Sequence, residues 1–303
     1  MLDAFLASTL AMATPILLAA LGELLVEESG IINIGIEGAM LMGAFSALAA
    51  TYFSGSFMLG LLMGAVAAVI LNAILAMLVV NFAVNQVVAG TALDILALGL
   101  SGVLYRKLFG VTGQAFMVAP IGRLRLGPLA RIPLIGEALF DQSPLVYIAF
   151  AVVPVLYWIL RNTRWGLRLR SAGERPEATD ALGLGVYALR WQALIISGAL
   201  TGIAGAFLTL AYANTFVEDI SAGRGFVALS VVILGRWNPW GIAAASVLFG
   251  AAMALQFSFQ ALGTNLPYQL FLALPYALTL VVLATIGGGH GGPSALGEPY
   301  VRS

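Results

Sequence analysis

Four carboxylates lie close together in an otherwise apolar stretch, "GELLVEESGIINIGIEGAMLMG": Glu23, Glu27, Glu28 and Glu37. Such a group could act in acid–base catalysis, coordinate a cation, or hold helices together. The first three precede an apolar run, so we expect them in a turn at a membrane surface, as structural residues near the positive end of the next helix. Glu37 lies about one and a half turns into that run, where it must be paired, hydrogen-bonded or facing water, because exposure to lipid is costly.

The rest of the sequence offers little support for catalysis. It has no cysteine, and its only histidine, His290, lies in the glycine-rich "GGGHGG". Its only lysine, Lys107, lies in "YRKLFG", which excludes a phosphate-binding loop of the form GxxxxGK[ST]. No HExxH motif, Cys/His cluster or Ser/His/Asp set is present. We therefore expect no enzyme activity, no metal site and no cofactor in this chain, and transport is the function that remains.

The composition is that of an integral membrane protein. Of its 303 residues, 61% are hydrophobic and 9% are charged, whereas an average soluble domain has roughly 25% charged residues. The mean hydropathy is +0.99. The net charge is zero, and without a strongly basic segment no nucleic-acid partner is expected. Membrane lipid is the expected environment.

Apolar runs of about 20 residues, long enough to cross a bilayer as a helix, recur along the chain. A further run, 226–234, is too short and is expected to be a half-helix, or a span completed by the flanking "SAGRG" and "GRWNP". Alternating segments typical of a barrel are absent. We predict one domain, 1–303, that is an all-α polytopic membrane bundle of about 8–10 helices, including a short or broken one. The full-length runs are 5–25, 31–52, 58–80, 82–105, 144–160, 191–212, 240–260 and 266–286.

Two pairs of glycines have the spacing of a helix-packing motif. Gly60 and Gly64 flank "LLM", and Gly198 and Gly202 flank "ALT". Small residues four apart allow two helix backbones to approach closely. We expect both pairs at contacts between helices.

The arginines predict the orientation in the membrane. The loop 161–190 holds six of them and is expected in the cytoplasm, where the first three glutamates could pair with Arg164 or Arg168. Counting spans from this loop places the N-terminus outside and the tail 287–303 in the cytoplasm. The same count leaves the basic segment 106–143 on the extracytoplasmic side, against the usual bias, which long loops obey poorly.

Within the arginine-rich loop, "RPEATDALGLG" has the features of a short helix. Pro176 suits a first helical turn, Glu177 lies at the positive end of the dipole, and Gly183 can end the helix. A short helix flanked by arginines could dock a cytoplasmic partner. The alternative is an ordinary charged loop at the membrane interface, and composition alone favours neither.

Five segments form an ordered set of motifs: "GELLVEESGIINIGIEGAMLMGAFSA", "NQVVAGTALDILALGLSGVLY", "TRWGLRLRSAGERPEATDALGLGVYALRWQ", "GRGFVALSVVILGRWNPWGIAAASVLFGA" and "GGPSALGEPYVRS". Together they resemble, over nearly the whole chain, the permease subunits of bacterial ATP-binding cassette (ABC) importers of the branched-chain amino acid and ribose permease superfamily. The resemblance is strongest to the nucleoside branch. In that branch, two different permeases form a heterodimer, and the length of this chain is similar to that of the shorter subunit.

The resemblance implies a multi-pass subunit of the bacterial inner membrane that imports nucleosides or related purine compounds. Separate ATPase subunits would bind ATP and Mg²⁺, a second permease would complete the pathway, and an extracytoplasmic binding lipoprotein would deliver the small-molecule substrate. The coupling segment of the family, which contacts the ATPase, matches Glu174, Arg175, Pro176, Ala178 and Gly183.

A route for nucleosides needs amides, hydroxyls and aromatic faces rather than fixed charge. Polar residues near span ends and two aromatic residues are therefore candidates, although each alone is more often an interhelical contact. Basic residues of the outer segment could dock the binding protein by charge, the alternative being a solvated loop. The pathway candidates are Asn33, Glu37, Phe45, Asn85, Gln86, Asn214 and Phe226, and the docking candidates are Arg106, Lys107, Arg123, Arg125 and Arg131.

Two alternatives stay open. Within the same class, the substrate could be riboflavin, a simple sugar or a branched-chain amino acid. The rival class is an ion-coupled secondary transporter, which would need a titratable group in the membrane. Glu37 and Asp94 are the candidates near a span interior, and Asp94 stands where the resembling permeases more usually have Asn or Thr.

Overall fold

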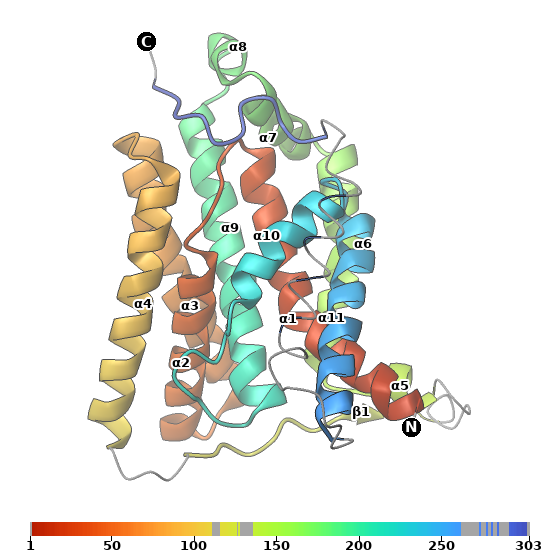
Figure 1. Ribbon diagram of the computed structural model, residues 1–303. Helices are drawn as coiled ribbons and strands as arrows, with labels where there is room; N and C mark the ends of the chain where they lie inside the picture. Colours follow the sequence, from red (N-terminus) through yellow and green to blue (C-terminus); the bar gives the residue numbers. More distant parts are fainter. Residues whose placement is uncertain are drawn as a thin grey trace.

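The computed structural model describes residues 2–110, 116–125, 127, 136–261, 273, 277, 280, 284 and 291–301. Within these residues the chain is almost entirely helical (Figure 1). The helices are α1 (Leu2–Glu28), α2 (Ile36–Ser54), α3 (Phe57–Ala76), α4 (Gln86–Phe109), α5 (Gly136–Phe140), α6 (Pro144–Asn162), α7 (Arg164–Glu174), α8 (Pro176–Ala181), α9 (Val186–Phe207), α10 (Arg224–Leu234) and α11 (Pro239–Ala261). The π-helical turns η1 (Met77–Asn81) and η3 (Leu208–Tyr212) continue α3 and α9, and the short strands β1 (Leu124–Arg125) and β2 (Asp141–Gln142) pair antiparallel.

Seven helices in the described part of the chain are long and apolar enough to cross a membrane. They coincide with seven of the predicted full-length runs, which confirms the all-α polytopic bundle. The remaining predicted run, 266–286, falls outside the described residues apart from a few isolated positions. The short helix α10 confirms the half-helix predicted at 226–234.

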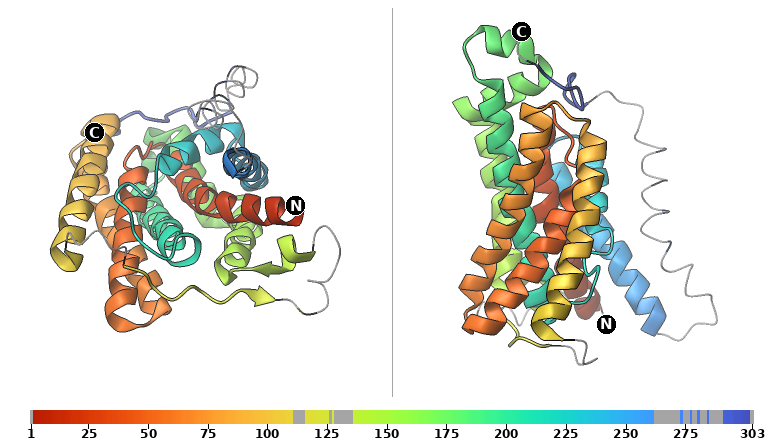
Figure 2. Two further views of the ribbon diagram at one scale, coloured as in Figure 1. Left: turned by 60° about the horizontal axis from the view of Figure 1, so that its bottom comes forward. Right: turned by 90° about the vertical axis from the view of Figure 1, so that its left-hand side faces the viewer.

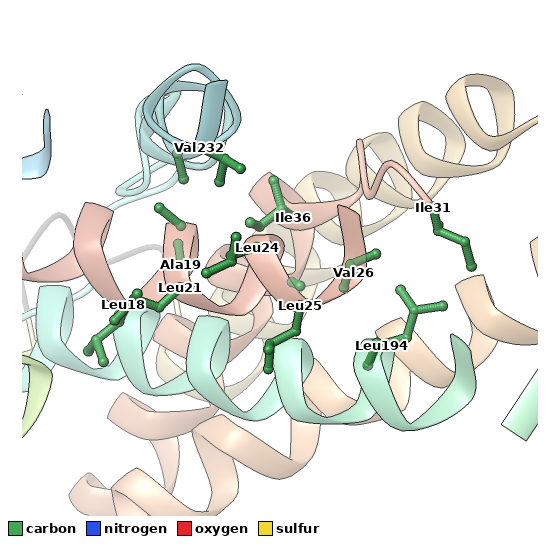
Figure 3. Close-up of a cluster of buried hydrophobic side chains, with 14 of the residues drawn as sticks. Leu18, Ala19, Leu21, Leu24, Leu25, Val26, Ile31, Ile36, Leu194 and Val232 are labelled. Carbon is green, nitrogen blue, oxygen red and sulfur yellow. The ribbon is translucent and has the colours of Figure 1, made fainter. Parts of the chain in front are cut away.

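Helix α1 runs through the middle of the bundle. It packs against α9, α10 and α11, and its leucines are buried over most of its length. Figure 3 shows Leu24 and Leu25 of α1 between Leu194 of α9 and Val232 of α10. Because lipid tails are as apolar as leucine, the stabilisation of such contacts inside a membrane comes from close packing rather than from removal of water.

Helices α2, α3 and α9 meet at glycines. A Cβ atom on Gly202 would lie 2.4 Å from the carbonyl oxygen of Gly64, and one on Gly43 would lie 2.7 Å from the Cα of Gly202. A Cβ on Gly198 would lie 2.9 Å from the Cα of Val69. These distances leave no room for a methyl group, so the backbones are in direct contact. A Cβ on Gly60 would lie 3.0 Å from the carbonyl oxygen of Ala47 on α2. The predicted packing role is therefore confirmed for both glycine pairs.

Two segments run through the bundle without forming helices (Figure 1). Residues 29–35 connect α1 to α2 as a turn and an extended stretch, and residues 213–223 connect η3 to α10 as a loop. The second span is therefore helical only from Ile36, not from Ile31 as predicted. Backbone groups in such breaks must find partners other than lipid. Those partners define the candidate site.

The arginine-rich helix α7, the short helix α8 and the C-terminal residues 291–301 lie at one end of the bundle, and the N-terminus lies at the other (Figures 1 and 2). The tail is thus on the same side as the arginine-rich segment. Arg190 differs from the prediction, which placed it in the loop 161–190. It belongs to α9 and is buried, with 1% of its surface exposed, because the helix begins at Val186.

Candidate translocation and coupling sites

The carboxylate of Glu37 caps the N-terminus of the short helix α10. Gly223 donates its backbone N–H to Oε1 at 2.7 Å, and Gly225 donates its own to Oε2 at 2.6 Å. The first N–H groups of a helix have no partner within it, and the helix dipole favours an anion there. Glu37 is the second residue of α2, not one and a half turns into a helix as expected, and it is 8% exposed. Backbone donors therefore meet its need for hydrogen bonds.

Asp94 of α4 plays a similar part at the N-terminus of α2. Its Oδ1 accepts the backbone N–H of Gly38 at 2.7 Å, whereas its Oδ2 is buried without a hydrogen-bond partner. A Cβ atom on Gly38 would lie 2.9 Å from the Cα of Asp94, so α2 and α4 are in contact at this point. Asp94 and Glu37 thus hold, in turn, the N-terminal ends of α2 and α10.

Polar side chains hold the extended segment 29–35 in place. Gln86, at the start of α4, accepts the backbone N–H of Ile32 at 2.8 Å. Glu23 of α1 accepts the backbone N–H of Asn33 at 2.9 Å. Two neighbouring helices therefore satisfy backbone groups that a continuous helix would have paired internally.

A buried amide pair continues this network. The Asn33 side-chain amide lies 3.5 Å from the amide oxygen of Asn72, and Asn72 donates to the carbonyl oxygen of Leu194 at 3.0 Å. The network joins the break to α3 and α9. Among the predicted pathway residues, Glu37 and Gln86 accept backbone N–H groups, and the Asn33 side chain is bonded to that of Asn72. Their role in translocation stays a prediction.

The expected surface position is wrong for Glu23 and Glu27. Glu23, Glu27 and Glu28 all belong to α1, and the first two are buried, at 0% and 3% exposed. The helix continues through Glu23 and Glu27, which accept hydrogen bonds from Asn33 and Trp237, and ends at Glu28. The ion pairs in the described part of the chain join other residues. A salt link to Arg164 or Arg168 is not among them.

The other pathway candidates lie in different surroundings. Asn85 caps α4 by accepting two of its first N–H groups. Phe45 is 4% exposed and packs edge-on against Phe216, with ring centroids 5.7 Å apart. Asn214, with φ 56°, lines a cavity of about 340 Å³ formed by α1, α6 and the end of α9. Phe226 is 46% exposed on α10, the helix that Glu37 holds.

Two of the predicted docking residues are paired within the chain. Arg106 forms an ion pair with Glu218, and Arg125 forms one with Asp141 at 3.3 Å, across the β1–β2 pair. Their charges are therefore partly neutralised inside the protein. The other docking candidates are Lys107 and Arg123, which are exposed, and Arg131, which lies outside the described residues.

The predicted short helix in the arginine-rich segment is present as α8. Pro176 begins it, and Gly183 follows its end in the left-handed conformation, with φ 78°. Leu182, the last residue before that glycine, is 79% exposed. A groove of about 250 Å³ lies between this turn, α7 and the start of α9. The predicted coupling residues lie together at this α7–α8 corner: Glu174, Arg175, Pro176, Ala178 and Gly183.

Three residues that sequence reasoning did not single out support the break. Asn72 and Arg190 are each 1% exposed, and Arg190 donates through Nε to the carbonyl oxygen of Ser29 at 3.1 Å. Trp237, at the corner between α10 and α11, donates through Nε1 to Glu27 at 2.6 Å. A lone asparagine inside the apolar "VILNAIL" was an available signal for Asn72. Nothing near Trp237 in sequence indicates its partner.

The polar side chains of this arrangement hold backbone groups in position. Among the described residues, no group of three or more His, Asp or Glu side chains is placed to hold a metal ion. Both oxygens of Glu37 accept backbone N–H groups. A carboxylate engaged in this way fixes the position of a short helix, and its release would let that helix move.

Known proteins are similar in sequence to this chain over its full length. A family model described as the permease component of the branched-chain amino acid transport system matches residues 5–283. The chain is 36% identical over 311 residues to the nucleoside ABC transporter permease protein NupC of Lactococcus lactis, covering 100% of this chain and 98% of that protein. It is 33% identical to the guanosine ABC transporter permease protein NupQ of Bacillus subtilis, covering 97% and 95%. It is 34% identical to TsgC13 of Haloferax volcanii, provisionally named a glucose ABC transporter permease protein, covering 97% and 96%.

Each of these three organisms also has a second matching permease, with identities of 24%, 26% and 27%. A solved structure described as a metal-chelate-type ABC transporter in an inward-facing conformation resembles the fold, with a TM-score of 0.54. It covers 93% of this chain and 85% of its own at 17% identity. The match of the family model to most of the sequence shows that the chain belongs to the protein family described as the permease component of the branched-chain amino acid transport system.

Proposed function

We propose that this chain is the membrane permease subunit of an ABC importer for nucleosides or related purine compounds. The observation that carries the proposal is its similarity, from end to end, to permeases named for nucleoside and guanosine transport. The chain is a transport component, and separate ATPase subunits would bind ATP and Mg²⁺ and drive the cycle. The membrane would be the bacterial inner membrane, with the N-terminus outside and the C-terminus in the cytoplasm.

The α7–α8 corner would receive the ATPase. It presents an exposed leucine, Leu182, and the exposed residues Glu174, Arg175 and Ala178 at the end of the bundle that carries most of the arginines. An apolar side chain surrounded by polar residues matches the apolar centre and polar rim of a protein interface. Movements of the ATPase would reach the bundle through this corner.

The face formed by α4 and α10 would line the pathway. Asp94 is only half-buried on α4, and a carboxylate in a membrane span faces protein or water rather than lipid. Phe226 presents an exposed aromatic ring on α10, the helix held by Glu37. A second permease, such as the second matching protein in each related organism, would cover this face and complete the route.

An extracytoplasmic binding lipoprotein would deliver the substrate at the opposite end of the bundle. The basic residues Lys107 and Arg123 are exposed there and would attract an acidic surface of the delivering protein. Arg106 and Arg125 would contribute less, because each is already paired with a carboxylate.

The test is uptake by the whole transporter. The chain, a second permease, the ATPase and the binding lipoprotein are reconstituted in vesicles, and entry of labelled guanosine is followed. Uptake is expected to need ATP and the binding protein and to persist with a protonophore. Uptake that a protonophore abolishes, or that proceeds without ATP, would instead identify an ion-coupled secondary transporter.

A simple sugar is the second candidate substrate. The similarity to TsgC13, at 34% identity, is close to that with the nucleoside permeases. Competition of unlabelled glucose with labelled guanosine in the same vesicles decides between them. We expect adenosine and inosine to compete and glucose to have no effect.

A further inference from the structure

The C-terminal residues 291–301 return to the bundle and bind beside the coupling corner (Figures 1 and 2). The Ser294 hydroxyl oxygen lies 2.7 Å from both the carbonyl oxygen and Oε2 of Glu174, and it donates its one hydrogen to either of them. Ala295 is buried, and its backbone N–H donates to the carbonyl oxygen of Gly173 at 3.0 Å. The segment, which we call the C-terminal strap, is therefore bonded to the end of α7, next to α8.

The same strap is bonded to the start of the break in the second span. Gly297 donates its backbone N–H to the carbonyl oxygen of Gly30 at 3.0 Å. Gly30 has φ 89°, and a Cβ there would lie 3.0 Å from the guanidinium of Arg190 and 3.3 Å from the Cα of Gly173. The strap, the first turn of the break and α7 thus meet at one tightly packed point.

An aromatic anchor holds the far end of the strap. Tyr300 is 9% exposed, and its ring lies 5.8 Å from the guanidinium carbon of Arg190 and 5.9 Å from the ring of Tyr187. Arg190 in turn donates to the carbonyl oxygen of Ser29. A cation–π contact is stronger when both groups are removed from water. The anchor therefore reaches the same break from the side of α9.

The opposite end of the strap contacts the corner between α10 and α11. A Cβ atom on Gly292 would lie 2.7 Å from the ring of Trp237, so the strap passes directly over this indole. Trp237 also binds Glu27 of α1. The strap therefore contacts the coupling corner, the break and the turn between α10 and α11.

We propose that the C-terminal strap transmits movement of the α7–α8 corner to residues 29–35 and, through them, to the Glu37 contact with α10. Backbone hydrogen bonds link Gly173 to Ala295 and Gly297 to Gly30, only two residues apart along the strap. A displacement of α7 by the ATPase is passed on over this short distance. Segment 29–35 ends at the first turn of α2, where Glu37 holds the N-terminus of α10.

The strap residues act as positioning residues, not as substrate contacts. This inference rests on the proposed function, because it assumes that ATP hydrolysis by a partner drives the permease. Coupling between two sites in proteins typically changes an equilibrium by about 5–150-fold. Loss of the strap contact should therefore reduce coupling by at least about 5-fold while leaving ATP hydrolysis without substrate unchanged.

The main test variant is Ala295→Asp in the complete reconstituted transporter. A charge at this buried position forces the strap away from α7 without changing a membrane span. The matched control is Val301→Asp, the same kind of change at a strap residue that is 68% exposed. The measurements are the ratio of ATP hydrolysis with binding protein and substrate to hydrolysis without them, and the initial rate of guanosine uptake.

We expect Ala295→Asp to lower both the ratio and the uptake by at least about 5-fold and Val301→Asp to behave as wild type. If Ala295→Asp does not assemble, two double variants are compared instead. The first, Ser294→Ala with Tyr300→Leu, removes the hydroxyl and the ring. The second, Ser294→Thr with Tyr300→Phe, keeps both. Reduced coupling in the first pair alone supports the strap.

Normal coupling in Ala295→Asp would overturn the proposed role of the strap while leaving the proposed function intact. If Ala295→Asp does not assemble, normal coupling in the first double variant would have the same meaning. A wild-type complex whose uptake does not depend on ATP would overturn the proposed function, and the strap with it. The two failures are therefore distinguishable in one set of vesicles.

Discussion

The carboxylate of Glu37 accepts the backbone N–H of Gly225 at 2.6 Å, although 188 residues separate them in sequence. Its other oxygen accepts the N–H of Gly223, so one side chain on α2 serves as the cap of another helix. This contact connects the two interrupted parts of the bundle. A change at either end of the contact should therefore affect α10 first.

Replacement of Glu37 by glutamine should destabilise the protein. An amide offers one acceptor oxygen, and its NH₂ group would face a backbone N–H, so one of two bonds is lost and a buried donor is left unpaired. We expect a loss of about 1–3 kcal/mol in the free energy of unfolding and a lower Tm in detergent. Glu177→Gln is the control, because Glu177 lies exposed in the first turn of α8 and should contribute at most about 1 kcal/mol. Equal Tm values for the two variants would contradict the capping role.

Replacement of Asp94 by asparagine should leave transport within about 2-fold of wild type, because one oxygen is enough to accept the N–H of Gly38. Leucine at the same position removes the acceptor and should lower the Tm. The comparison also separates two mechanisms. A transporter driven by proton binding at Asp94 would lose uptake in Asp94→Asn as completely as in Asp94→Leu.

A methyl group at Gly202 should disrupt the contact of α9 with α3. The new Cβ would lie 2.4 Å from the Gly64 carbonyl oxygen, which belongs to the backbone and cannot rotate away. Overpacking of this kind costs about 1–3 kcal/mol. The matched control is Gly99→Ala on α4, where no atom lies within 4 Å of the new Cβ, so that variant should be neutral or stabilised by about 1 kcal/mol. Similar losses in both variants would show that the close approach does not matter.

The positions of the spans and of the two short helices could be predicted from local sequence. Apolar run length identifies the spans, and Pro176 and Gly183 mark the ends of α8 because their backbone requirements are local. The length of α10 followed from a run too short to cross the membrane. In each of these cases, the deciding physics lies within a few residues of the feature.

The break at 29–35 and the true end of α1 could not be predicted in the same way. Charged residues were expected to end the first helix, yet Glu23 and Glu27 continue it, because Asn33 and Trp237 supply their hydrogen bonds. Those partners come from other parts of the chain. A pattern of hydrophobicity contains no information about them, and so the network around the candidate pathway emerged only from the three-dimensional arrangement.

The exposed leucine of the coupling corner gives a sharp test of the ATPase contact. Leu182 is 79% exposed, so Leu182→Asp should leave the Tm unchanged while weakening binding of the ATPase subunit. Loss of a hot-spot residue costs about 2 kcal/mol or more, so we expect roughly a 30-fold rise in Kd. Leu182→Met keeps the apolar contact and should bind normally. Unchanged co-purification of the ATPase with Leu182→Asp would show that the ATPase binds at another surface.

Charge reversal at the end of the bundle opposite the coupling corner should have different effects at two of the docking arginines. Arg123 is exposed, whereas Arg125 is paired with Asp141 at 3.3 Å. We therefore expect Arg123→Glu to slow association of the binding protein and to reduce its dependence on salt, because steering acts through unpaired charge. Arg125→Glu should change association less, and mainly by repelling Asp141 within the chain. The association rate is measured by surface-bound transporter at several salt concentrations. Equal effects of the two reversals, or no effect of either, would show that this surface does not dock the binding protein by charge.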